Sequence, residues 1–432
     1  MSAGSPDEIV VPVDATNNQS NSQPRIQRVP SMMYEIAENR RCYEPMVVSI
    51  GPFHHGRHGT ERMEQLKIKQ EQQFISDIGS DRYPAIYQIF DVVAREARDC
   101  YDLGPLSELS NDVFKRMMFR DGCFILYYIY SVVEDIPGVT RMKRDQKAYV
   151  MRDLFLLENQ LPFIVLKELM CLRFDKTKFN ELITKFIQWQ TVIPSNPALQ
   201  EDSQPLHLLD LYQNELCRTA PSVRPPLPKS WPISQANWPS FRSVAELKAS
   251  GIECERSTTC SLEDIKFKSG INKSYLLLPP IIIDDLSKPK FLNLVAYETC
   301  PDAPNDFTVS TYISFLNSLI DSTKDVKELR SKGILRNVLG SDQQVADLFN
   351  NLTIGLVSNS QLYRDVKWGI ERHYRSKTRI WMADMRHTYF HNPWSAIAFA
   401  AALLALLLTM IQTYYAIFPR DNNNGSSNSK LT

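Results

Sequence analysis

Apolar and polar positions recur with a helical period along most of the chain. Between Glu61 and Ile78, the side chains of Met63, Leu66 and Phe74 fall mostly at helical spacing, and polar side chains fill the other faces. This pattern predicts an amphipathic helix. The same pattern predicts further helices over residues 113–128, 143–157, 163–170, 179–189, 206–216, 244–249, 291–300, 311–320, 326–332 and 341–352.

The apolar helix over residues 113–128 is expected to be central in the fold. Ser110 precedes it and is suited to cap its first turn, because a serine hydroxyl accepts a backbone N–H there. Asp121 lies among the apolar residues. It must either point away from the core or be buried with a partner, because an unpaired buried carboxylate is costly.

The pattern changes between residues 252 and 284. Short apolar runs, such as YLLL and III, are separated there by polar or proline-containing breaks. This arrangement predicts a small antiparallel sheet. The expected fold class is therefore mainly α, or α+β with one small sheet, plus a single C-terminal transmembrane helix.

Two segments lack the composition of a packed core. Residues 1–24 are rich in Asn, Gln, Ser and Pro, which predicts a disordered tail. Residues 219–240 are dense in proline and predict an internal loop without regular hydrogen bonding. The expected organisation is one mainly helical domain over residues 25–390, whose first part is an extended, wrapping segment.

Residues 393–418 form the longest apolar stretch of the chain, and no charge interrupts it. About 25 residues suffice for a helix to cross a hydrocarbon layer of about 30 Å. Trp394 and Phe418 lie at the two ends, where aromatic side chains meet the membrane interfaces, and Leu403 and Leu407 lie near the middle. This predicts a membrane-spanning helix, which is followed by a short polar tail over residues 419–432.

The start of the chain lacks the basic and apolar regions of a signal peptide, so we expect the protein to be tail-anchored. Basic residues before the span predict a cytosolic location for the large domain, and the long span favours a plasma membrane. The same residues are candidates for contact with anionic lipid headgroups, the alternative being an ordinary charged helix that only sets topology. They are Arg375, Lys377, Arg379 and Arg386.

Charge and cysteine content narrow the function classes. The 432 residues include 49 Lys plus Arg and 49 Asp plus Glu, so no overall positive field attracts nucleic acid. The eight cysteines are scattered without metal-ligand spacing, which fits reduced thiols in a cytosolic domain.

His54, His55 and His58 are the most chemical-looking cluster. Three imidazoles near one loop can bind zinc or supply a general base. Adjacent histidines in an extended segment point to opposite sides, however, and no Cys, Asp or Glu completes a site at the usual spacing. The sequence also lacks the common hydrolase, zinc-protease, dinucleotide and kinase motifs. We expect a non-enzymatic protein with no cofactor and no evident small-molecule substrate.

Polar residues interrupt the apolar run DLFLLENQLPF at residues 153–163. Capping and buried polar joints explain such residues most simply. The alternative is an acid/base pair formed by Asp153, Glu158 or Asp210. We predict a structural joint made of Asp153, Glu158, Asn159 and Gln160.

The chain contains, in this order, the segments IQRVPSMM, YEPMVVSIGPFHHG, RDGCFIL, DLFLLENQLPF, LHLLDLY, LVAYETC and the NPW before the apolar span. With this set of segments it resembles the plant family known as domain of unknown function 247. The resemblance implies a mostly helical domain with a C-terminal anchor and brings no established enzymatic activity. Some grass members are linked to pollen and stigma self-incompatibility, which points to protein recognition.

The sequence therefore predicts a tail-anchored protein-interaction module whose partners are a lipid bilayer and an unidentified protein. One alternative is a membrane-tethered hydrolase or metal enzyme that uses the three histidines. Another is a cell-surface recognition protein with inverted topology. In that case the acceptor sequences at Asn272 and Asn351 would be glycosylated.

Overall fold

A computed structural model of the chain is mainly helical with a small sheet, which confirms the predicted fold class. The chain divides into two compact units, although the sequence predicts one domain over residues 25–390. The predicted N-terminal tail and proline-rich loop lie outside the described residues. The structure describes residues 26–102, 104, 109–136, 142–191, 205–218, 242–270, 273–301, 303, 306–352, 356–375 and 393–417.

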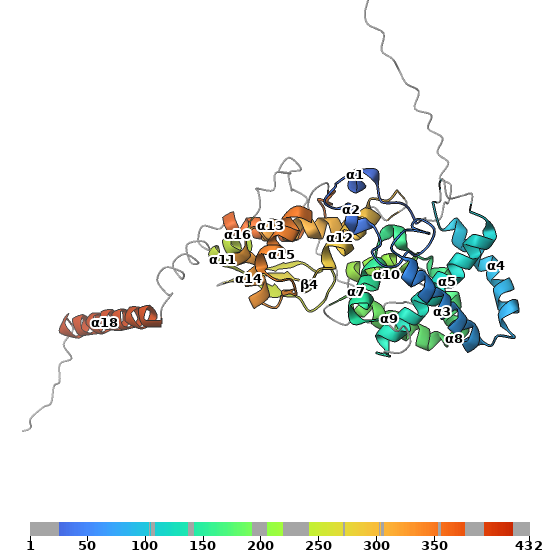
Figure 1. Cartoon of the computed structure of the whole chain (residues 1–432). Coiled ribbons are helices and arrows are strands. Elements are labelled where there is room, and N and C mark those ends of the chain that lie inside the picture. Colours follow the sequence, from blue (N-terminus) through green and yellow to red (C-terminus); the bar gives the residue numbers. More distant parts are fainter. Residues whose placement is uncertain are drawn as a thin grey trace, which may run out of the picture. The chain divides into compact units, whose positions relative to one another are not determined.

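Unit 1 comprises residues 1–186, 199–212 and 292–305, and helix α5 (Asn111–Val133) lies at its centre. The Ser110 hydroxyl accepts the Val113 N–H at 3.3 Å, as predicted for an N-cap. Helix α5 is buried on almost every face because α3, α4 and α8 pack around it (Figure 1). The other helices of this unit are α1 (Ser31–Tyr34), α2 (Arg40–Tyr43), α3 (Glu61–Ile78), α4 (Tyr83–Asp99), α7 (Arg144–Asp153), η2 (Leu157–Asn159), α8 (Phe163–Arg173) and α9 (Lys176–Gln188).

Helix α9 crosses a unit boundary by its last two residues, and two further helices also cross a boundary. They are α10 (Leu208–Cys217) and α12 (Ser287–Glu298). The elements of unit 2 are α11 (Val244–Ala249), β1 (Ile252–Arg256), β2 (Lys266–Lys268), β3 (Ser274–Leu278), β4 (Ile281–Ile283), α13 (Thr308–Leu319), α14 (Thr323–Ser331), β5 (Leu335–Asn337), α15 (Asp342–Leu352), α16 (Arg364–Arg375) and α18 (Pro393–Ile417).

The sheet of unit 2 is mixed, so the prediction of a purely antiparallel sheet was wrong. Strand β3 is central and pairs in parallel with β1 and antiparallel with β2. The chain reaches β2 before it returns as β3, and this detour allows β1 and β3 to run in the same direction. A second, two-stranded sheet pairs β4 in parallel with β5, which the sequence did not predict because β5 is only three residues long.

Candidate functional site

Helix α18 has the length and composition of a membrane span. The stretch from Ile397 to Tyr414 contains no Asp, Glu, Lys or Arg, and none of it is buried. The side chains of Leu403 and Leu407 are 47% and 58% exposed. A soluble helix would bury at least one apolar face, so this exposure fits insertion into a hydrocarbon layer. The Trp394 side chain and Phe418 lie outside the described residues.

Helix α16 carries the first of the predicted lipid contacts. Arg375, its last residue, is 67% exposed and lies 3.4 Å from Glu371. The Tyr374 hydroxyl donates to the Glu246 carbonyl at 3.0 Å, and the Arg242 guanidinium lies 3.7 Å from the centre of the Tyr374 ring. The helix is therefore packed within unit 2. Lys377, Arg379 and Arg386 lie outside the described residues.

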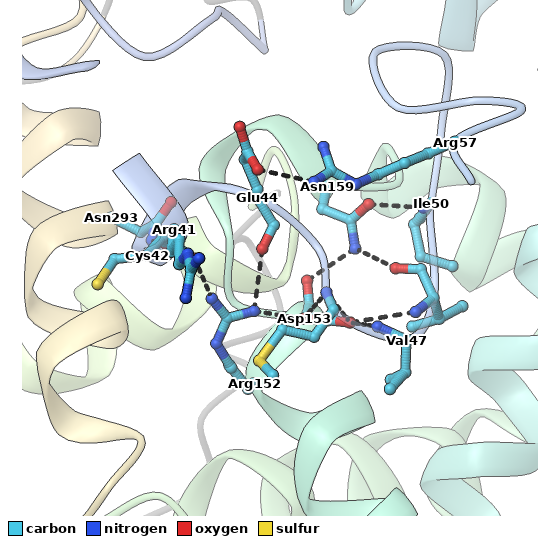
Figure 2. A network of polar contacts seen from close by, with 12 residues as sticks. Arg41, Cys42, Glu44, Val47, Ile50, Arg57, Arg152, Asp153, Asn159 and Asn293 are labelled. Carbon is cyan, nitrogen blue, oxygen red and sulfur yellow. Dashed lines mark hydrogen bonds and ion pairs between the residues drawn. The ribbon is translucent and has the colours of Figure 1, made fainter. Parts of the chain in front are cut away.

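A buried polar network of unit 1 holds residues 26–59, which we call the N-terminal strap. The Asp153 carboxylate accepts the backbone N–H groups of Met46, Val47 and Val48 at 2.8–3.1 Å. Figure 2 shows this carboxylate among the backbone groups of the strap. Burial raises the pKa of the Asp153 carboxyl, and the backbone amides and Arg152 act in the opposite direction.

Arg152, beside Asp153, binds the strap through carbonyl groups. Its guanidinium donates to the carbonyls of Arg41 at 2.6 Å and Glu44 at 3.0 Å, and to the Asp153 carboxylate at 2.7 Å (Figure 2). Arg152 is 5% exposed and Asp153 is fully buried. A buried ion pair is tolerated when such hydrogen bonds satisfy both partners.

The other three predicted joint residues also bind backbone groups. Asn159 accepts the Ile50 N–H at 2.7 Å and donates to the carbonyls of Val48 and Asp153. Glu158 accepts the Val29 N–H at 2.9 Å. The Gln160 amide donates to the carbonyls of Leu154 and Leu156 and accepts the Leu209 N–H. The structure thus places Asp153, Glu158 and Asn159 against the strap, and Gln160 between segments of the core.

The carboxylates proposed as an alternative acid/base pair have separate partners. Asp153 faces the strap, whereas Asp210 accepts the Leu206 N–H at 2.8 Å and the Tyr297 hydroxyl at 3.1 Å. Each carboxylate is therefore used as an acceptor for groups of the fold itself.

The sequence requires Asp121 either to point away from the core or to be buried with a partner, and the structure shows the second arrangement. Its carboxylate lies 2.7 Å from the Lys67 ammonium and accepts the Gly51 N–H at 2.8 Å. Lys67 also donates to the Ser49 carbonyl. Lys67 was missed as a joint residue, because a lysine in an amphipathic helix normally lies on the solvated face.

Gly51 is expected to be intolerant of substitution. Its φ is +70°, and a Cβ there would lie 2.9 Å from both the Gln160 carbonyl oxygen and the Tyr101 hydroxyl. We expect Gly51→Ala to lower the free energy of unfolding by roughly 2–3 kcal/mol, from backbone strain plus overpacking. Gly56→Ala is the matched control, because Gly56 has φ +76° with nothing within 4 Å of the added Cβ. Equal losses for both variants in urea titrations of the full chain would contradict the close contact.

The three histidines do not converge. The His54 side chain is 11% exposed and its Nε2 lies 3.4 Å from Glu158. His55 is exposed, and the fully exposed His58 lies beside Glu61. Over the described part of the chain, no three His, Cys, Asp or Glu side chains are close enough to hold a metal ion. This geometry gives no support to the metal-enzyme alternative.

The buried His54 predicts a pH dependence. Burial, together with the positive charges of Arg57 and Arg28, lowers its pKa to about 4. The unfolded state takes up a proton near pH 6.5 and the folded state does not. The stability that neutral His54 contributes is therefore complete above pH 6.5, and about 3 kcal/mol of it is lost as the pH drops to 4.

His54→Gln is expected to remove this part of the pH dependence. His58→Gln should leave it unchanged, because the His58 side chain is fully exposed. Urea titrations of the full chain between pH 7 and pH 4 measure the difference. Identical pH slopes for the wild-type protein and His54→Gln would show that His54 is not a buried neutral group.

Comparison with known proteins gives a family. The profile of a family described as "Plant protein of unknown function" matches residues 26–408. UPF0481 protein At3g47200 of Arabidopsis thaliana is 28% identical over 443 aligned residues, covering 93% of this chain and 88% of that protein. Putative UPF0481 protein At3g02645 of the same plant is 22% identical over 473 residues, covering 87% of each. No solved structure matches significantly. The chain belongs to the plant family known as domain of unknown function 247.

Proposed function

We propose that this protein is a tail-anchored, single-pass membrane protein whose folded part lies in the cytosol and acts as a non-enzymatic protein-interaction module. The observation that carries the proposal is the exposure of α18, in which no residue from Ile397 to Tyr414 is buried. Leaving so many leucine side chains in water is unfavourable, by roughly 1.5–3 kcal/mol for each side chain. A bilayer removes this cost.

Two features support an interaction role rather than catalysis. Asp153 and Glu158, two candidates for an acid/base pair, accept backbone N–H groups of the strap. The strap in turn presents side chains to solvent, such as Met32 and Met46, which are 73% and 54% exposed. Exposed methionines adapt to many partners, so the strap is suited to protein contact.

The approach to the span supports the orientation. Arg375, Lys377, Arg379 and Arg386 precede α18, and basic residues are retained on the cytosolic side of a membrane. Near an anionic leaflet, each contributes about 1 kcal/mol of attraction. The 25-residue length of α18 suits a thicker membrane, such as the plasma membrane.

Proximity labelling tests both parts of the proposal. The full chain and a chain ending at residue 392 are each fused to a biotin ligase, with residues 390–432 alone as the anchor-only control. We expect the full chain in the membrane fraction, the shortened chain in the soluble fraction, and labelled proteins absent from the anchor-only control. A shortened chain that stays in the membrane fraction would contradict anchoring by α18. Labelling that equals the anchor-only control would contradict the interaction role.

A further inference from the structure

Helix α4 exposes an apolar stripe on the face opposite its buried side. Phe90, Ala94 and Ala97 are buried against unit 1. On the other face, Ile89 and Val92 are 69% and 50% exposed. Ala85 is also exposed, and Ile86 and Val93 are half-buried on the flanks of the same stripe. A helix with apolar residues on two faces is typical of one that packs against a second partner.

The charges at the ends of this stripe are complementary to each other. Arg82 precedes Ile89 by seven residues and Glu96 follows it by seven, so all three lie on one face after two turns in each direction. Arg82 and Glu96 are both exposed. The stripe is therefore about 21 Å long and has a positive end, an apolar centre and a negative end.

We propose that α4 pairs with α4 of a second copy of this chain in an antiparallel arrangement with two-fold symmetry. Ile89 would lie against Ile89 of the other copy, at the symmetry axis. Arg82 of each copy would then lie opposite Glu96 of the other. Ala85 would lie opposite Val93, and Ile86 opposite Val92. Such an interface uses the same surface on both subunits, as two-fold symmetry requires.

A second copy of this chain fits the stripe better than a different protein does. In an antiparallel pair, the positive end of one stripe meets the negative end of the other. A second copy therefore supplies both ion pairs without any other partner. An antiparallel pair also sets the N-terminus of each helix beside the C-terminus of the other, which aligns the helix dipoles favourably. The proposal does not depend on membrane anchoring.

Charge reversal distinguishes this dimer from other associations. Arg82→Glu and Glu96→Arg each replace two attractive contacts with two repulsive contacts in a homodimer. When the two variants are mixed, every contact between unlike chains is attractive again. Both variants are compatible with the helix, because Arg82 makes no side-chain cap and each new charge suits its helix end.

The experiment uses the full chain in detergent, labelled with two fluorophores, and measures energy transfer on dilution. We expect the wild-type chain to self-associate, each charge variant alone to associate at least tenfold more weakly, and the mixture to recover to within threefold of wild type. Ile89→Asn should abolish association without lowering the melting temperature. A monomeric wild-type chain, a mixture as weak as the single variants, or undiminished association of Ile89→Asn would overturn the proposal.

Discussion

Asp153→Asn is expected to destabilise unit 1 by about 4 kcal/mol and to release the N-terminal strap. One carboxylate oxygen faces Arg152 and the Met46 N–H, and the other faces the N–H groups of Met46, Val47 and Val48. An asparagine in either orientation sets an NH₂ group against donors and leaves Arg152 without a buried counter-charge. We expect the melting temperature of the full chain to fall by roughly 10 °C.

Limited trypsin digestion adds a local measurement. Arg41 and Arg57 lie in the strap and should become cleavable in Asp153→Asn, because the backbone of the strap is no longer held. Asp99→Asn is the matched control, since Asp99 is an exposed carboxylate at the end of α4. An Asp153→Asn variant with wild-type melting and an uncleaved strap would contradict the role of Asp153 as the main acceptor for the strap.

Leu403→Arg combined with Leu407→Arg is expected to remove the protein from membranes. Each arginine near the middle of a span costs about 2.5–3.5 kcal/mol of insertion free energy, so the pair costs roughly 5–7 kcal/mol. The soluble fraction after alkaline carbonate washing should contain most of the variant. The melting of the folded units should be unchanged, because both leucines are exposed.

Leu403→Ile combined with Leu407→Ile controls for altered sequence at these positions, and this variant should stay in the pellet. An arginine variant that remains in the washed pellet would show that α18 does not hold the protein at the membrane.

The sequence predicts the elements of this fold better than their pairing. Helix α5 follows from its apolar period and its Ser110 cap, and α18 from an uninterrupted apolar run. Helix α4 was not predicted, because Ile89 and Val92 add a second apolar face that obscures the helical period. The direction of β1 relative to β3 could not be predicted from the sequence either, because strands of five residues contain too few positions to specify their pairing.

For the polar joint, too, the burial of the residues could be predicted but their partners could not. Glu158, Asn159 and Gln160 interrupt two apolar runs, so they were predicted to be buried with partners, and all three are buried. Their partners could not be predicted from the sequence. The Val29 and Ile50 N–H groups, which Glu158 and Asn159 accept, are more than 100 residues away in the chain. A backbone amide also carries no residue-specific signal that would identify it as a partner.

Glycosylation mapping distinguishes a cytosolic folded part from one on the opposite side of the membrane. A glycosylation acceptor is added after Thr432 of the full chain, and endoglycosidase sensitivity is measured in plant cells. We predict that the added acceptor is modified and that Asn272 and Asn351, which precede the span in the sequence, are not. Modification of Asn272 or Asn351 without modification of the added acceptor would establish the inverted topology and contradict a cytosolic folded part.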